Sequence, residues 1–216
     1  MPVGETYLIK ILEEHLAKYK ESGFIFLAPF FFKETESRKL ILTISTSNLG
    51  RISLGSASIK NYEIEKITSP IFEKHNIPWN EWSTTFVSEI PKENRNRLIP
   101  VDNETEIKEA LKEIDEYIEN YCFTVWNSFS DIDRHISVIN SKSEEELNKG
   151  SFQGVTGIMN RMTITCLLRD KYFDEKSTFY KTLLNEYREK KQEQYTNLYN
   201  GYIELIDTLK TSYNKG

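Results

Sequence analysis

The sequence is poor in the residue types that most often build metal and redox sites. Its 216 residues include two cysteines and three histidines. Cys122 and Cys166 each lie among apolar residues in segments of helical character, which favours two reduced structural thiols over a disulfide. Zinc ligands recur at short, regular Cys and His spacings, and the sequence has none of these. We therefore expect neither a metal site nor a cofactor.

Long apolar runs and an excess of positive charge are also missing. The longest stretch without a polar side chain is residues 24–32, far below the roughly 20 residues that a membrane-spanning helix needs. Residues 1–21 carry charges throughout, unlike a signal peptide. The 28 basic residues are outnumbered by 33 acidic ones, giving a formal net charge of -5, which disfavours nucleic acid as a partner. We expect a cytoplasmic protein that does not enter a membrane.

The N-terminal part of the chain has the pattern of a helix followed by a sheet. Residues 1–21 have mostly the pattern of an amphipathic helix with apolar side chains on one face, and Gly23 ends that helix. The runs "FIFLAPFFFKE" and "KLILTISTS" are expected to pair as a hairpin through "TESR". Further strand candidates are "RISLGSASI", with a change of phase at Gly55, then "YEIEKI" and "STTFVSEI". Their short connections predict an antiparallel sheet of four or five strands.

Two details of this region carry expectations of their own. "TSPIFEKHNI" has the pattern of a short helix that starts at Pro70. Read as one strand, "FIFLAPFFFKE" is apolar on both faces, and such a strand is usually covered on both. We expect the N-terminal helix to cover one face and the helical half of the chain to cover the other.

Beyond residue 100 the pattern is helical. The segment 91–100 is polar and bracketed by prolines, as in a linker. Asn103 with Glu106 has the pattern of a helix cap, and apolar residues then repeat at steps of three and four from Ile107 to Val125. The sequence therefore predicts an α+β protein, with a helix and sheet over 1–100 and a helical bundle over 101–216 that packs on the sheet as one unit.

Local motifs offer little catalytic chemistry. His15 lies on an apolar helical face and His75 at an expected helix end, where a histidine favourably meets exposed carbonyls. In "DIDRH", Asp131 and His135 share a helical face and could begin a metal site, but no further His or Cys follows at a familiar spacing. An ordinary helix start with acidic residues in its first turn is favoured. We name no catalytic residue.

The glycine-spaced segment "GSFQGVTG" is a candidate anion site. Amide groups at a helix start can hold an anion, with Gly154 and Gly157 in the segment and Arg161 one turn further on. No Gly-Lys-Ser/Thr sequence follows and no apolar strand precedes it, so an ordinary loop between two helices is favoured. The two glycines also suit close packing of helices.

Aromatic residues suggest binding surfaces. Trp79, Trp82 and Phe86 lie within eight residues, and they either anchor a partner or close the base of the core, the alternative that we favour. Near the C-terminus, aromatic residues share one face of a polar helix, where they either seal a bundle seam, which we favour, or form a stripe facing a partner. These residues are Tyr195, Tyr199 and Tyr202.

The order of elements resembles that of certain uncharacterised bacterial domains of unknown function. The resemblance rests on a leading amphipathic helix, "RISLGSAS", "SPIFEKHNIPW", and "EIKEALKEIDEYIENY" running into "SFSDIDRHI". Some of these domains occur beside toxin genes and are suspected immunity proteins, which implies protein binding but transfers no functional residue. We expect a non-catalytic, cytoplasmic protein-binding factor of a bacterium, such as an immunity or regulatory protein. The alternative is a small-molecule or nucleotide-binding enzyme with a site around residues 131–161.

Overall fold

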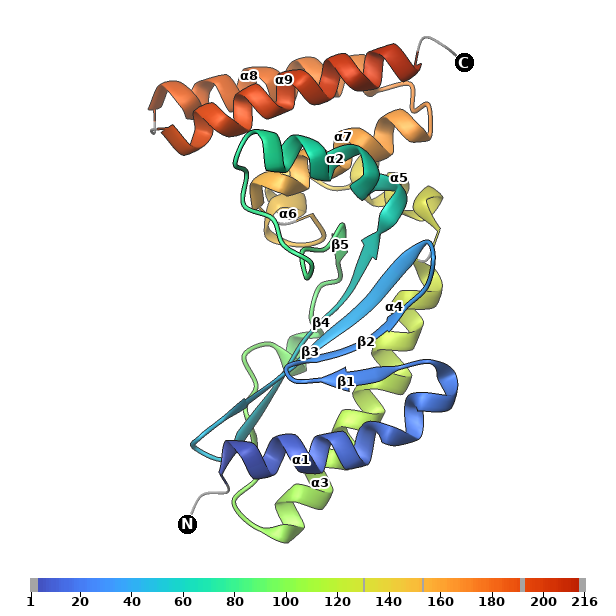
Figure 1. Cartoon of the computed structure of the whole chain (residues 1–216), viewed down its shortest axis with the longest axis vertical. Helices are drawn as coiled ribbons and strands as arrows, with labels where there is room; N and C mark the ends of the chain where they lie inside the picture. Colours follow the sequence, from blue (N-terminus) through green and yellow to red (C-terminus); the bar gives the residue numbers. More distant parts are fainter. Residues whose placement is uncertain (1–3, 130, 153, 191–192, 214–216) are drawn as a thin grey trace. The chain divides into compact units, whose positions relative to one another are not determined.

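The computed structural model describes residues 4–129, 131–152, 154–190 and 193–213 (Figure 1). It confirms the α+β class, with an N-terminal helix, a six-stranded antiparallel sheet and a helical C-terminal half. The chain forms two compact units, Met1–Ile59 with Val87–Ser130 and Lys60–Phe86 with Asp131–Gly216. The first helices beyond residue 100 thus belong with most of the sheet. That the predicted halves pack as one body stays a prediction.

The first unit begins with two helical segments and a three-stranded meander. These are α1 (Glu5–Leu16), the 3-10 helix η1 (Ala17–Ser22), β1 (Ile25–Leu27), β2 (Phe30–Glu34) and β3 (Arg38–Ser47). Strands β2 and β3 pair antiparallel with Phe31 opposite Leu42, which confirms the predicted hairpin. The single strand predicted over residues 24–34 is wrong, because the chain reverses at Ala28–Pro29 and β1 pairs back onto β2.

This reversal also changes which apolar side chains are covered. Cross-strand pairing places Ile25 opposite Phe32 and Leu27 opposite Phe30. Ile25 is 53% exposed and Leu27 60%, so the prediction that this segment is covered on both faces is wrong for β1.

The rest of the sheet is built on one long strand. β4 (Arg51–Asn61) follows β3, and the sheet order is β1-β2-β3-β4-β5, with β6 also paired to β4. The last two strands are short, β5 (Phe86–Val87) and β6 (Ile99–Pro100), and the 3-10 helix η2 (Lys92–Asn94) lies between them. Along β4 the buried positions change phase after Gly55, as predicted.

Aromatic rings fill the core of the first unit. Phe31, fully buried on β2, lies 5.0 Å from the Phe24 ring and 5.5 Å from the Tyr19 ring. Phe24 also packs 5.5 Å from Phe123 and 5.3 Å from Trp126. The buried side of β2 therefore shares one aromatic cluster with η1 and with the helix after residue 122.

The helical segment predicted from Ile107 to Val125 is present. It consists of α3 (Glu104–Tyr117), the π-helical turn η3 (Ile118–Cys122) and α4 (Phe123–Ser128). Asn103 is its N-cap, and the Asn103 side-chain oxygen accepts a hydrogen bond from the Glu106 amide at 3.0 Å. This satisfies one of the amide groups that a helix start leaves without a partner.

The second unit is helical. It contains α2 (Tyr62–Lys74), α5 (Ile132–Ser141), α6 (Glu144–Lys149), α7 (Gly154–Leu167), α8 (Phe173–Lys190) and α9 (Glu193–Tyr213). In Figure 1, α8 and α9 run side by side and pack on α7, while α2 packs on α7 and α9. No helix in the described part of the chain is long and apolar enough to cross a membrane.

Two predictions for residues 61–77 need correction. The strand predicted at "YEIEKI" is wrong, because these residues begin α2. The short helix predicted at Pro70 is part of α2, which starts at Tyr62 and contains Pro70 in its interior. Asn61 is the cap: its side chain accepts hydrogen bonds from the Glu63 amide at 2.9 Å and the Ile64 amide at 3.3 Å.

Candidate functional site

The tryptophan segment packs into the second unit. The Trp79 indole donates a hydrogen bond to the Glu65 carboxylate at 3.3 Å, and the Lys60 ammonium lies 4.9 Å from the centre of the Trp79 ring. Lys60 also pairs with Glu65 at 3.0 Å. Phe86 is buried, and Trp82 is half-buried. Trp79 and Phe86 therefore have the contacts of core residues, the alternative that the sequence favours.

The C-terminal tyrosines differ in exposure. Tyr202 is fully buried and its hydroxyl donates to the Ser177 carbonyl at 3.0 Å. Tyr199 is half-buried beneath the Arg188 guanidinium, 4.3 Å from the ring centre. Tyr195, also half-buried, lies 5.6 Å from the Tyr187 ring. These contacts join α9 to α8, so the three tyrosines line the seam between the two helices.

The arginine that follows the glycine segment is buried, so the segment does not form an open anion site. Gly154 begins α7, and a Cβ added to Gly157 would lie 2.1 Å from the Phe152 carbonyl oxygen, so only glycine allows this approach. The Arg161 side chain is fully buried. Its guanidinium donates to Glu144 at 3.0 Å and to the Asn148 side-chain oxygen at 3.2 Å.

Tyr180 completes this cluster. Its hydroxyl donates to the Glu144 carboxylate at 2.6 Å, and the Arg161 guanidinium lies 5.1 Å from the centre of its ring. Burial is the main cause that raises the pKa of Tyr180. Because Glu144, Asn148 and Tyr180 already surround the positive charge of Arg161, the cluster ties α6, α7 and α8 together.

The histidines have separate surroundings. His15 Nε2 lies 2.9 Å from the Asp115 carboxylate, which also accepts hydrogen bonds from Lys18 and Tyr19. His75 Nε2 lies 2.8 Å from Glu204. His135 is fully buried and its ring stacks on Phe86 at 4.9 Å. Within the described ranges, no group of three or more His, Cys, Asp or Glu side chains is placed to hold a metal ion.

A row of exposed aromatic residues follows α8, for which the sequence analysis names no site residue. Three aromatic residues in or just before this helix are strongly exposed: Phe179 at 48%, and Tyr172 and Tyr187 at 40% each. They are spaced by seven and eight residues, close to two helical turns each, and so form one row along the helix. Leu183, half-buried, lies in the same row between Phe179 and Tyr187. We call Tyr172, Phe179 and Tyr187 the α8 aromatic row.

A buried face of the same helix supports this row. Phe173, Tyr180 and Leu184 of α8 are buried in the core of the second unit. The 7/8 spacing was visible in the sequence, but it does not distinguish exposed Phe179 from its neighbour Tyr180, which is fully buried.

Charged side chains border the α8 aromatic row. Glu175 lies one turn before Phe179 and Glu186 two turns after it, so both fall on the same side of the row, and both are exposed. Glu186 pairs with Lys190 at 3.6 Å, where both side chains are exposed. On the other side Lys176 is half-buried, and its ammonium donates to the Ile139 carbonyl at 3.4 Å. One edge of the row is therefore acidic.

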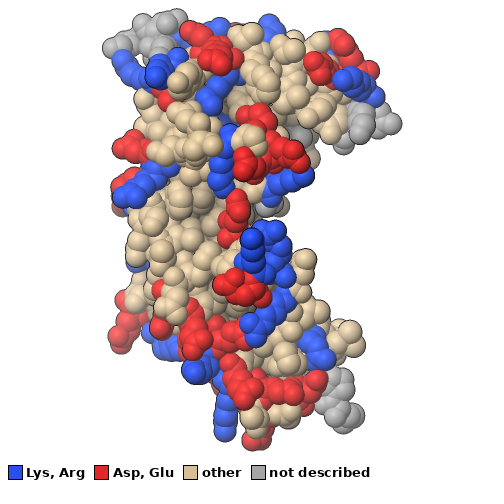
Figure 2. All heavy atoms as spheres, turned by 180° about the vertical axis from the view of Figure 1, so that it is seen from behind, with Lys and Arg blue, Asp and Glu red and all other residues tan. Residues whose placement is uncertain are grey.

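A shallow groove also lies in the seam between α8 and α9. It has a volume of about 250 Å³ and a floor that includes buried Tyr202 and Ile206. Lys181, Lys210 and Asp207 border it, so its charges are mixed in sign. The wider surface is also mixed: in Figure 2 acidic and basic side chains are interspersed on the face shown.

No protein-family model, curated protein or solved structure matches this chain. The basis for a functional proposal is therefore the surface of the molecule itself.

Proposed function

We propose that this protein is a non-catalytic protein-binding factor of the bacterial cytoplasm, in the manner of an immunity or regulatory protein, and that the α8 aromatic row is its contact surface. The observation that carries the proposal is the row itself. Phe179 and Tyr187 on α8, and Tyr172 directly before it, are exposed, while the other face of the helix is fixed in a core.

Aromatic residues in such a position suit a protein interface. They offer a large contact area with few rotatable bonds, and they are enriched at binding hot spots. Burying an exposed Phe or Leu side chain contributes roughly 2 kcal/mol. Because the α8 backbone is held by buried Phe173, Tyr180 and Leu184, little ordering is needed when a partner binds.

The alternative of an enzyme around residues 131–161 has less support. Its proposed cation, Arg161, is buried and bonded to Glu144 and Asn148. His135 is buried in a stack with Phe86, away from solvent. Thermal-shift measurements with nucleotides and divalent metals test this alternative directly, since a ligand that binds the folded state raises Tm.

The proposal is tested by affinity capture from the source organism with the wild-type protein and a Phe179→Asp variant. Tyr7→Asp is the matched control, because Tyr7 is 57% exposed on α1 of the first unit. We expect one stoichiometric protein that is lost with Phe179→Asp and retained with Tyr7→Asp. The complex is then rebuilt from purified components and its Kd measured. A partner that binds both variants equally, or a large Tm increase with a nucleotide or metal and no partner, contradicts the proposal.

A further inference from the structure

We infer that the α8 aromatic row is a docking site for an amphipathic helix of the partner, with basic residues along one edge of its apolar face. The inference rests on the proposed function and adds the chemical class of the partner.

The shape of the row favours a helix over other partners. Tyr172 lies directly before α8, and from Phe173 at the start of the helix to Tyr187 the row spans about 21 Å of helix. Its members follow steps of seven and eight residues, with Leu183 between Phe179 and Tyr187. Phe179, Leu183 and Tyr187 form an i, i+4, i+8 ridge, which matches the grooves on another helix, whose own apolar residues recur every three or four positions. A partner helix of about four turns would cover the whole row.

The charges beside the row favour basic residues on the partner. Glu175 and Glu186 both lie on one side of Phe179 and both are exposed. The contact between Glu186 and Lys190 is an exposed i,i+4 pair, which contributes little and exchanges readily for a better one. A partner with Lys or Arg along this edge would neutralise both carboxylates while its apolar side chains cover the aromatic rings.

The lysines on the other side of the row are less available to a partner, because they already contact groups of this chain. The Lys176 ammonium is committed to the Ile139 carbonyl, and burial, the largest cause, lowers its pKa. The Lys171 ammonium lies 4.9 Å from the centre of the Tyr172 ring. The electrostatic preference of the row therefore comes from the edge formed by Glu175 and Glu186.

The same carboxylates argue against two other occupants. If two copies of the chain paired antiparallel through the centre of the row, Glu175 of one copy would face Glu186 of the other. The two carboxylates would repel each other. An anionic lipid surface would meet the same repulsion. A basic helix is the occupant that matches both the apolar row and its acidic edge.

Two synthetic peptides test the inference directly. Each has about 18 residues and the same apolar face; one has Lys along one edge of that face, and the other has Glu at these positions. Binding to the full chain is measured by fluorescence anisotropy at low and high salt. We expect the Lys peptide to bind at least about tenfold tighter than the Glu peptide, with the difference reduced by salt.

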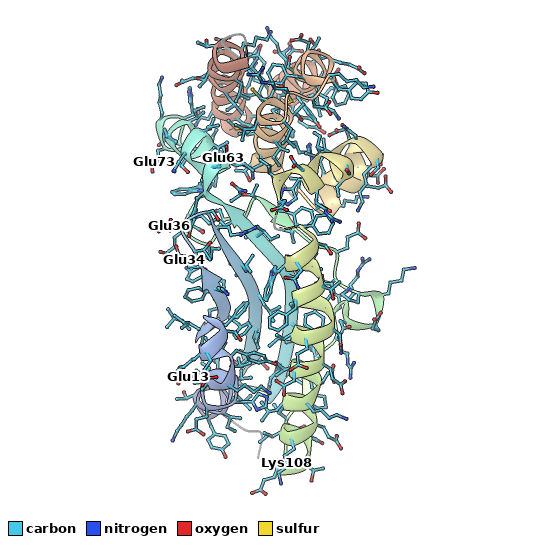
Figure 3. All side chains as sticks on the ribbon, turned by 90° about the vertical axis from the view of Figure 1, so that its right-hand side faces the viewer. Glu13, Glu34, Glu36, Glu63, Glu73 and Lys108 are labelled. Carbon is cyan, nitrogen blue, oxygen red and sulfur yellow. The ribbon has the colours of Figure 1, made fainter. Side chains whose placement is uncertain are left out.

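Variants of the protein locate the site. Phe179→Ser should weaken the Lys peptide by about tenfold, and Glu175→Lys with Glu186→Lys should reverse the preference to the Glu peptide. The matched controls are Tyr7→Ser and Glu13→Lys on α1, which should leave the affinity for both peptides unchanged. Glu13, labelled on α1 in Figure 3, is exposed. These side chains are exposed, so the variants should keep the far-UV circular dichroism of the wild type.

Several results would overturn the inference. They are equal binding of the two peptides, equal weakening by Tyr7→Ser and Phe179→Ser, tight binding to anionic vesicles that needs Phe179, and a wild-type dimer that Phe179→Ser dissociates. If a natural partner is captured through Phe179 but the peptides show no charge preference, this inference fails and the proposed function stands. If natural capture is also independent of Phe179, both fail.

Discussion

Removing the Glu144 carboxylate should destabilise the second unit more than removing the Arg161 guanidinium with which it pairs. The two side chains differ in exposure, since Arg161 is 0% exposed and Glu144 is 31% exposed. In Glu144→Ala the Arg161 guanidinium stays buried and loses the carboxylate with which it pairs. In Arg161→Met the remaining carboxylate reaches water and keeps the hydrogen bond from Tyr180.

The magnitudes follow from this difference. Removing one partner of a buried ion pair costs about 3–5 kcal/mol, and we expect the lower end for Glu144→Ala because Asn148 still accepts a hydrogen bond from Arg161. Arg161→Met keeps an apolar side chain in the buried space and leaves groups that water can reach, so we expect about 1–2 kcal/mol. The matched control is Glu145→Ala on the same helix, whose pair with Lys149 is fully exposed, so this variant should unfold close to the wild-type urea midpoint.

Urea unfolding followed by circular dichroism gives the free energies of unfolding, and hydrogen exchange of peptides from α6, α7 and α8 assigns the change to the second unit. The reasoning is refuted if Arg161→Met costs more than Glu144→Ala. It is equally refuted if Glu144→Ala cannot be distinguished from Glu145→Ala.

Three other measurements test the fold. Gly157→Ala improves helix propensity by about 1 kcal/mol but places a Cβ against the Phe152 carbonyl, so we expect net destabilisation of about 2 kcal/mol. Gly201→Ala should lower Tm less, because the nearest atom to its Cβ would be the movable end of the Ile77 side chain and not backbone. Asn103→Ala should cost about 1 kcal/mol in urea unfolding, because the α3 cap is lost, and no change would contradict the capping role. Burial raises the pKa of several tyrosines above the ordinary value of 10.0, so the unfolded chain ionises them first: their stabilisation is fully present below about pH 10 and is lost as the pH rises above it. Absorbance at 295 nm and urea midpoints between about pH 8 and 11 check this, and early, non-cooperative ionisation would contradict it for Tyr19, Tyr117, Tyr180 and Tyr202.

The parts of the fold that could be predicted are those with strong local signals. The helical segment from α3 to α4 could be predicted because its apolar residues repeat over about five turns and Asn103 precedes them. The β2–β3 hairpin was foreseen because a polar turn separates two apolar runs. The reversal at Ala28–Pro29 was missed because the residues around it are all apolar, so no polar turn marks the point where β1 folds back.

The start of α2 was missed for a different reason. Ile64, Thr68, Ile71 and Phe72 are its buried positions, and their spacing is helical, but Pro70 indicated a new start. The tertiary contacts of α2 tolerate a proline that cannot donate its own hydrogen bond.

The candidate sites could be predicted only in part. The sequence identifies aromatic residues but does not say which are covered, because burial depends on contacts between distant segments. Phe179 and Tyr180 are adjacent, yet one is exposed and the other is buried. The partners of Arg161, Glu144 and Tyr180, lie 17 and 19 positions away on two other helices. The sequence does not show these contacts, so Arg161 looked free to bind an anion.

The division of the chain into two units has a consequence for biosynthesis. Each unit is made of two separate segments, and the chain passes from one unit to the other after Ile59, Phe86 and Ser130. The first unit has its complete sequence once residue 130 has left the ribosome. By then residues 60–86 have already emerged, but the apolar face of α2 is covered only after α7 and α9 have been made. The apolar face of α2 is therefore exposed to solvent or to chaperones for the time in which residues 131–213 are synthesised.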